Sequence, residues 1–137
     1  MFKNCLLIIV IACFSLLNQV EKTLAQSPLT SAIVNTVGST RAPTETLNST
    51  WGGTSGDHGG VLTVWTTHKG TTSYYEAYFN NTKLNPAQVV NIFAPGSNRL
   101  IGRKIRWVYS GSSNYSGTFL FKVGSGITNL QARIHVR

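Results

Sequence analysis

The chain has 137 residues and carries 12 Lys and Arg against four Asp and Glu, a net charge of +8. This length is enough for one small domain with a single core. So few carboxylates leave little material for the paired acids of glycosidic cleavage. They also leave most cations unpaired, so we expect the field of the protein to attract anionic polymers or surfaces, although charge that serves solubility alone is the alternative.

Residues 1–25 are predicted to be a secretory signal. An apolar run from Cys5 to Leu17 follows a positive start, and small residues up to Ala25 precede a plausible cleavage site. The run is shorter than the roughly 20 residues that span a bilayer. We therefore expect a secreted, extracellular protein, and a retained membrane anchor is the alternative.

Both cysteines, Cys5 and Cys13, fall within the predicted signal. A mature chain from Gln26 has ten basic and three acidic side chains, a net charge of +7. Without thiols it has no disulfide, no thiolate metal site and no cysteine nucleophile. Burial alone must then hold the fold together, and the sequence predicts no cofactor.

Residues 26–60 are rich in Ser, Thr, Gly, Pro and Asn. This composition predicts a loosely ordered lead-in with one edge strand at Ala32–Val34. The many glycines from Trp51 to Gly60 predict a wide loop, because glycine adopts left-handed backbone angles at low cost.

Residues 61–137 are predicted to form the β domain. Val61–Thr67 is the first strand, and Thr72–Phe79 is predicted to be its hairpin partner. Ala87–Phe93 is interpreted as a strand because it is rich in β-branched residues, although Asn85 and Pro86 could also begin a helical turn. Short strands without a clear amphipathic helix predict an all-β fold, a small antiparallel β-sandwich or barrel.

Three alternating runs end the chain, at Lys104–Tyr109, Thr118–Val123 and Leu130–Arg137. Successive side chains of a strand point to opposite faces, so each run has an apolar side and a polar side. We expect Trp107 on the apolar side to enter the core. If the three strands are neighbours in one sheet, their cations converge on one surface, formed by Lys104, Arg106, Lys122, Arg133, His135 and Arg137.

This predicted basic sheet face suggests a binding module that is not an enzyme. The expected partner is an anionic glycan, an anionic lipid or a microbial surface, with Trp51 and Tyr115 accessible for stacking. Nucleic acid suits the charge but not the secretory route. The alternative is a structural or self-assembling component of a secretion or extracellular matrix, associating through an exposed edge of Thr72–Phe79.

Catalytic and metal sites are poorly supported. Ser55, Asp57 and His58 are close in sequence, but a triad requires mutual hydrogen bonds in space, and an enzyme would need a pocket that gathers His58 with Asp57 or Glu76. No histidine pair has metal-binding spacing. Three Asn-X-Ser/Thr triplets, in predicted loops or strand ends, predict N-glycosylation of the mature chain at Asn48, Asn80 and Asn114.

Several short motifs resemble the small secreted insect proteins of the multiprotein bridging factor two family. They are an early Thr50–Gly52, Ile105 with Arg106, Ser116 with Gly117, Val123–Gly126, and the closing run Ala132–Val136. The resemblance covers mainly the last third of the chain. It implies a small extracellular β protein of insect secretions or saliva without assigned enzymatic residues, and it transfers no functional residue.

Overall fold

A computed structural model describes residues 26–111 and 116–137, and these residues form strands and loops without a helix. The strands are β1 (Ser31–Ser39), β2 (Glu45–Ser49), β3 (Trp51–Gly53), β4 (Val61–Lys69), β5 (Tyr74–Phe79), β6 (Thr82–Leu84), β7 (Pro86–Phe93), β8 (Leu100–Ser110), β9 (Gly117–Gly124) and β10 (Asn129–Val136). Residues 1–25, with the predicted signal, and the two candidates Asn114 and Tyr115 lie outside the described ranges.

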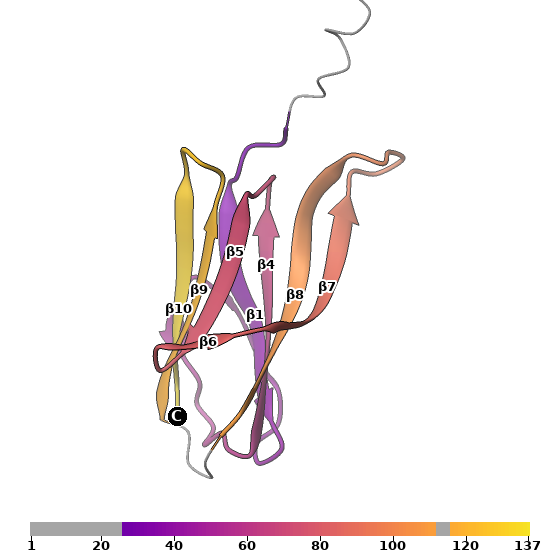
Figure 1. The fold of residues 1–137 in the computed structure, drawn as a ribbon. Coiled ribbons are helices and arrows are strands. Elements are labelled where there is room, and N and C mark those ends of the chain that lie inside the picture. Colours follow the sequence, from indigo (N-terminus) through magenta and orange to yellow (C-terminus); the bar gives the residue numbers. More distant parts are fainter. Residues whose placement is uncertain (1–25, 112–115) are drawn as a thin grey trace, which may run out of the picture.

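The strands form two five-stranded sheets that pack face to face (Figure 1). Sheet A has the order β2-β1-β4-β8-β7, and sheet B has the order β3-β10-β9-β5-β6. Every pairing is antiparallel except that of β3 with β10, which is parallel. The prediction of an all-β antiparallel sandwich is therefore confirmed.

The core lies between the sheets and is built by the alternation that the sequence shows. Trp107 on β8 is 1% exposed, and its ring meets Phe121 of β9 and Tyr75 of β5 at centroid distances of 6.1 and 6.3 Å. Its indole Nε1 donates a hydrogen bond of 2.9 Å to the hydroxyl of buried Thr66, so the polar atom of the ring is satisfied. The predicted core position of Trp107 is confirmed.

The prediction of a loosely ordered lead-in at residues 26–60 is wrong. β1 lies inside sheet A between β2 and β4, and β3 adds an edge to sheet B. A β-bulge shifts the register of β1 between Val34 and Thr36, so its buried residues are Ala32, Val34 and then Val37. One inserted residue breaks the period of two and hides the strand from pattern analysis.

Two predicted neighbour relations are also wrong. β4 pairs with β1 and β8 in sheet A, whereas β5 pairs with β9 and β6 in sheet B, so β4 and β5 are not a hairpin. The chain changes sheets between Lys69 and Tyr74. It changes sheets again between Ser110 and Gly117, which separates β8 from β9. Only β9 and β10 pair as the sequence predicts.

β7 is the strand that the sequence predicts at Ala87–Phe93, and the helical alternative is excluded. It forms one edge of sheet A and pairs with β8. Nearly all of its residues are exposed, including Val89 and Val90 at 41% each and Phe93 at 50%. Figure 1 shows β7 and the adjoining half of β8 bending away from sheet B, which explains this exposure.

Candidate binding faces

The six predicted cations do not share one surface. Lys104 and Arg106 lie on the outer face of sheet A, because their neighbours Ile105 and Trp107 are buried between the sheets. The other four lie on the side of sheet B: Lys122 belongs to β9, Arg133 and His135 belong to β10, and Arg137 directly follows the end of β10. The alternation within each strand is correct, but the assumed adjacency of β8 and β9 is not. The candidate site therefore divides into two faces.

Aromatic and basic side chains alternate across the outer face of sheet B. One row crosses the sheet in register, because Trp51 pairs with Arg133, Arg133 with Leu120, and Leu120 with Tyr78. Paired residues on the same face of a sheet lie side by side. Trp51 is 73% exposed, although its backbone is fixed in β3. The predicted accessibility of Trp51 is confirmed.

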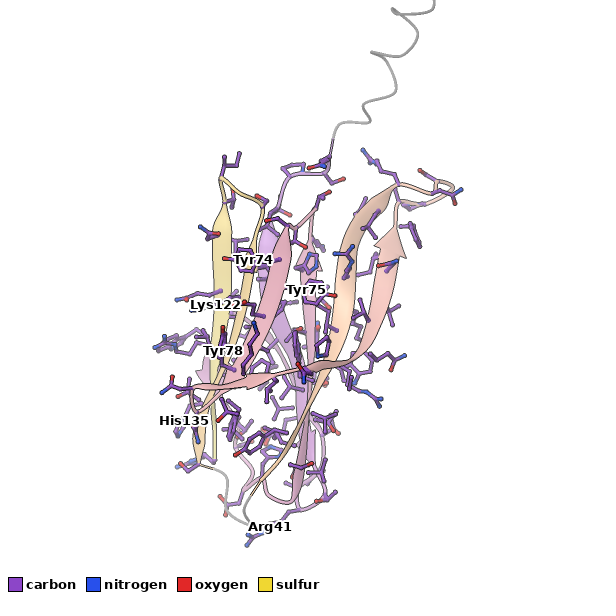
Figure 2. The ribbon with its side chains drawn as sticks, in the orientation of Figure 1. Arg41, Tyr74, Tyr75, Tyr78, Lys122 and His135 are labelled. Carbon is purple, nitrogen blue, oxygen red and sulfur yellow. The ribbon has the colours of Figure 1, made fainter. Side chains whose placement is uncertain are left out.

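A second row adjoins the first, with Lys122 between Gln131 and Glu76. Tyr74, 41% exposed, lies one step further along β5 and donates a hydrogen bond of 3.1 Å to Asn129. In Figure 2 the labelled side chains of Tyr74, Lys122 and Tyr78 follow one another down this side of the molecule. We call Trp51, Tyr74, Tyr78, Lys122 and Arg133 the sheet B face.

The one carboxylate on this face is already engaged. Glu76 lies 3.0 Å from the ammonium of Lys83 and accepts a 2.9 Å hydrogen bond from the hydroxyl of Tyr78. These two hydrogen bonds lower the pKa of Glu76 and keep it ionised. Lys122 Nζ lies 5.5 Å from the centroid of the Tyr78 ring. Neither Lys122 nor Arg133 forms an ion pair within the described ranges, so both remain available to an anion.

Two shallow grooves flank the rows of the sheet B face. One of about 290 Å³ is lined by Tyr74, Lys122 and the amides of Asn129 and Gln131. The other, of about 240 Å³, is lined by residues that include Tyr78, Asn80 and Arg133. Each groove combines an aromatic ring, a cation and side-chain amides. Such a surface offers stacking, charge and hydrogen bonds to an extended ligand.

No protein-family model, curated protein or solved structure matches this chain. The resemblance to the multiprotein bridging factor two proteins therefore stays a prediction. The function has to be argued from the chemistry of the two faces.

A larger groove of about 530 Å³ crosses the outer face of sheet A. Its lining is rich in hydroxyl groups and includes one aromatic ring and one cation. We call it the sheet A groove and define it by Thr36, Thr40, Thr44, Thr63, Trp65 and Lys104.

Trp65 holds two cations beside its ring. Lys104 Nζ and Arg106 Cζ lie 5.0 and 5.9 Å from the ring centroid. Both distances are within the range of a cation–π interaction. Neither cation forms an ion pair with a carboxylate in the described part of the chain. Sheet A thus presents its own basic site, centred on Trp65.

The glycine-rich loop after β3 turns its histidine inward. His58 is buried, with Nδ1 3.2 Å from Ser39 Oγ and Nε2 3.1 Å from Glu45 Oε1. The backbone N–H groups of Ser55 and Gly56 donate to the same carboxylate at 2.8 Å each. The bond from Ser55 is the main cause that lowers the pKa of Glu45 from 4.5 to about 2. This cluster joins the loop to β1 and β2.

The cluster contains a Ser, a His and an acid, but its geometry is that of a structural clamp. Ser39 Oγ accepts backbone N–H groups from three residues, so its lone pairs are engaged and it is a poor nucleophile. These donors are Arg41 at 3.3 Å, Ala42 at 3.0 Å and Gly59 at 3.2 Å. The pocket that would gather His58 with Asp57 or Glu76 is not formed, since Asp57 is exposed and Glu76 lies on the sheet B face.

The described ranges contain no group of three His, Cys, Asp or Glu that could hold a metal ion. Within the same ranges no helix is long and apolar enough to cross a membrane. Asn48 lies within β2, and Asn80 lies in the turn between β5 and β6. Both are exposed and adopt positive φ angles of 46° and 47°, a backbone conformation that Asn tolerates better than most other residues with a side chain. Glycosylation at these two residues stays a prediction.

The candidate binding residues predicted from the sequence do not include Tyr74, Tyr78 and Trp65. Their strands show the correct alternation, and Tyr74, Glu76 and Tyr78 share one side of β5 in the sequence. The missing information was which strand lies beside β5. Once β9 is known to be that neighbour, Lys122 and Tyr78 must share a face.

Proposed function

We propose that this protein is a secreted, non-enzymatic module that binds an anionic polysaccharide through the sheet B face. The observation that carries the proposal is the row in which exposed Trp51 adjoins Arg133, which leads on to Tyr78. Flat aromatic rings stack on the C–H faces of sugars, and the cations beside them bind carboxylate or sulfate groups. The amides of Asn129 and Gln131 supply hydrogen bonds to hydroxyl groups.

The charge distribution supports an anionic rather than a neutral glycan. Neither Lys122 nor Arg133 forms an ion pair among the described residues, and Glu76, which lies opposite Lys122 in register, is paired with Lys83. Like charges on adjacent strands repel, at a cost of a few tenths of a kcal/mol. An anionic ligand removes this cost when it binds.

The proposal is tested by heparin chromatography and by titration with a short heparin oligosaccharide. Arg133→Glu reverses a charge on the face, and Arg99→Glu makes the same change in the exposed connection between β7 and β8. We expect Arg133→Glu to lower the salt concentration of elution at least about twice as far as Arg99→Glu, because a contact is lost in addition to net charge. Equal shifts for the two variants would show that net charge alone governs retention.

Trp51→Ala tests the stacking contribution. We expect about tenfold weaker binding of the oligosaccharide, equivalent to roughly 1.4 kcal/mol, with partial recovery in Trp51→Tyr. Unchanged affinity in Trp51→Ala would remove the aromatic row from the proposal. Anionic vesicles in the same assay distinguish a lipid headgroup from a glycan, and preferential binding to the vesicles would contradict the proposal.

Self-association is the second candidate function, and β7 is a more suitable contact edge for it than β5. The predicted edge on β5 is partly covered, since β6 pairs with Ala77–Phe79. β7 has an outer edge that pairs with no described strand, and its sequence PAQVVNIF contains no charge. Uncharged edge strands are templates for pairing with another chain. Sedimentation should show concentration-dependent dimers that Val90→Lys abolishes, and a monomer at all concentrations would exclude this candidate.

A further inference from the structure

The sheet A groove and the sheet B face point in opposite directions. Trp65 and Lys104 lie on the outside of sheet A, and Trp51 and Arg133 lie on the outside of sheet B. The whole core, including Trp107, separates them. Stacked sheets are about 10 Å apart, so two layers of backbone and a layer of core lie between the two sites. A short oligosaccharide on one face cannot reach the other.

The two sites offer the same chemistry by different means. The sheet A groove places the Lys104 ammonium 5.0 Å from the Trp65 ring centroid. Arg106 is not among the residues that line the groove, but its Cζ lies 5.9 Å from the same centroid. The Nε atom of Arg106 is buried and has no hydrogen-bond partner in the described part of the chain. Threonine hydroxyls complete the groove. Aromatic, cationic and hydroxyl groups are again combined on an open surface.

We propose that the sheet A groove is a second site for an anionic polysaccharide, so that one protein molecule bridges two polysaccharide chains. This inference rests on the proposed function of the sheet B face. Back-to-back sites on a rigid sandwich cross-link long polymers, whereas a single site only coats them. Binding two chains at once makes the attachment multivalent, which strengthens retention in a polysaccharide network beyond the affinity of either site.

A sandwich capture experiment tests the bridging directly. Biotinylated heparin is immobilised, the full-length protein is bound, and fluorescein-labelled heparin is added after washing. We expect wild-type protein to capture the labelled heparin. Lys104→Glu in the groove and Arg133→Glu on the sheet B face should each still bind the immobilised chain, about tenfold or less weakened. Both variants should lose capture of the second chain.

Matched controls separate site loss from charge loss. Lys69→Glu, at the exposed end of β4, makes the same change as Lys104→Glu outside the groove, and Arg99→Glu matches Arg133→Glu. Both controls should retain capture. All the altered side chains are exposed, so the variants are expected to fold, and their melting temperatures verify this.

The outcomes distinguish the two proposals. Loss of all binding in Arg133→Glu with no effect of Lys104→Glu would overturn the second site and leave the first intact. Capture that persists in both face variants would overturn bridging by opposite faces, since self-associated copies would then supply the second site. Failure of the wild-type protein to bind immobilised heparin would overturn the proposed function itself.

Discussion

We expect His68, which belongs to neither binding face, to make the free energy of unfolding depend on pH. Its side chain on β4 is 1% exposed and stacks on Tyr75 at a centroid distance of 6.4 Å. Arg103 lies on the same tyrosine, with Cζ 5.7 Å from its centroid. Neither ring nitrogen of His68 has a hydrogen-bond partner in the described ranges. The fold therefore holds a neutral imidazole between its sheets.

Burial, followed by the positive charge of Arg103, lowers the pKa of His68 from 6.5 to about 4. A hydrogen bond to the backbone of Gly70 would raise the pKa of His68, but neither ring nitrogen is within hydrogen-bonding geometry of a partner in the described residues. The pKa of His68 is lower in the folded state than in the unfolded state. The contribution of neutral His68 to the free energy of unfolding is therefore complete above pH 6.5 and is lost as the pH falls toward 4. One pKa unit corresponds to about 1.4 kcal/mol. Protonation should therefore cost about 2 kcal/mol at pH 5 and about 3 kcal/mol in full.

His68→Phe keeps a ring against Tyr75 and removes the titration. Urea unfolding followed by tryptophan fluorescence at about pH 7.5 and about pH 5 measures the free energy of unfolding at each pH. Wild-type protein should lose about 2 kcal/mol more than His68→Phe over this interval. The control His135→Gln changes an exposed histidine and should behave as wild type. If the free energy of unfolding of His68→Phe fell between the two pH values as much as that of the wild type, the reasoning would be refuted.

Three further substitutions test the framework. Thr66→Val should cost about 1–3 kcal/mol in urea unfolding because it leaves the Trp107 indole N–H unpaired, whereas Thr63→Val on the outer face should cost less than about 0.5 kcal/mol. Gly70→Ala should lower the melting temperature by several degrees, since Gly70 has a φ of +101° and an added Cβ would collide with the backbone of Pro28. An unchanged melting temperature would contradict this close approach. Glu45→Gln should cost about 1–3 kcal/mol at neutral pH, and the wild-type advantage should fade between pH 4.5 and pH 2 as the carboxylate protonates; an advantage that persists at pH 2 would contradict the clamp.

The sequence predicts the fold class and the inward face of every strand in its last third. Ile105, Phe119 and Ile134 enter the core as their alternation requires. Alternation does not reveal which sheet a strand joins, because both sheets of a sandwich bury one face in the same way. The assumption that consecutive strands are neighbours placed Lys104 beside Lys122. Long-range pairing, β8 with β4 and β9 with β5, separates them.

The N-terminal strands escaped prediction for a different reason. β1 carries the inserted residue Asn35, so a strand with fully buried Val34 and Val37 does not show strict alternation. β3 is three residues long and contains two glycines, which are disfavoured in strands. Its pairing with β10 depends on a segment about 80 residues further along the chain, and no local pattern encodes that contact.

The sequence order of the strands determines which sheet can form first while the chain is being synthesised. Sheet A is complete once Ser110 has been made, but β9 and β10, which occupy the middle of sheet B, come last. Until Val136 leaves the ribosome, Trp107 and the valines of β1 have no opposing layer of Phe119, Phe121 and Ile134. Such distant pairings fold slowly, typically in milliseconds to seconds. Before β9 and β10 have been made, the chain therefore exposes the apolar inner face of sheet A, and such exposed apolar surface is prone to aggregation.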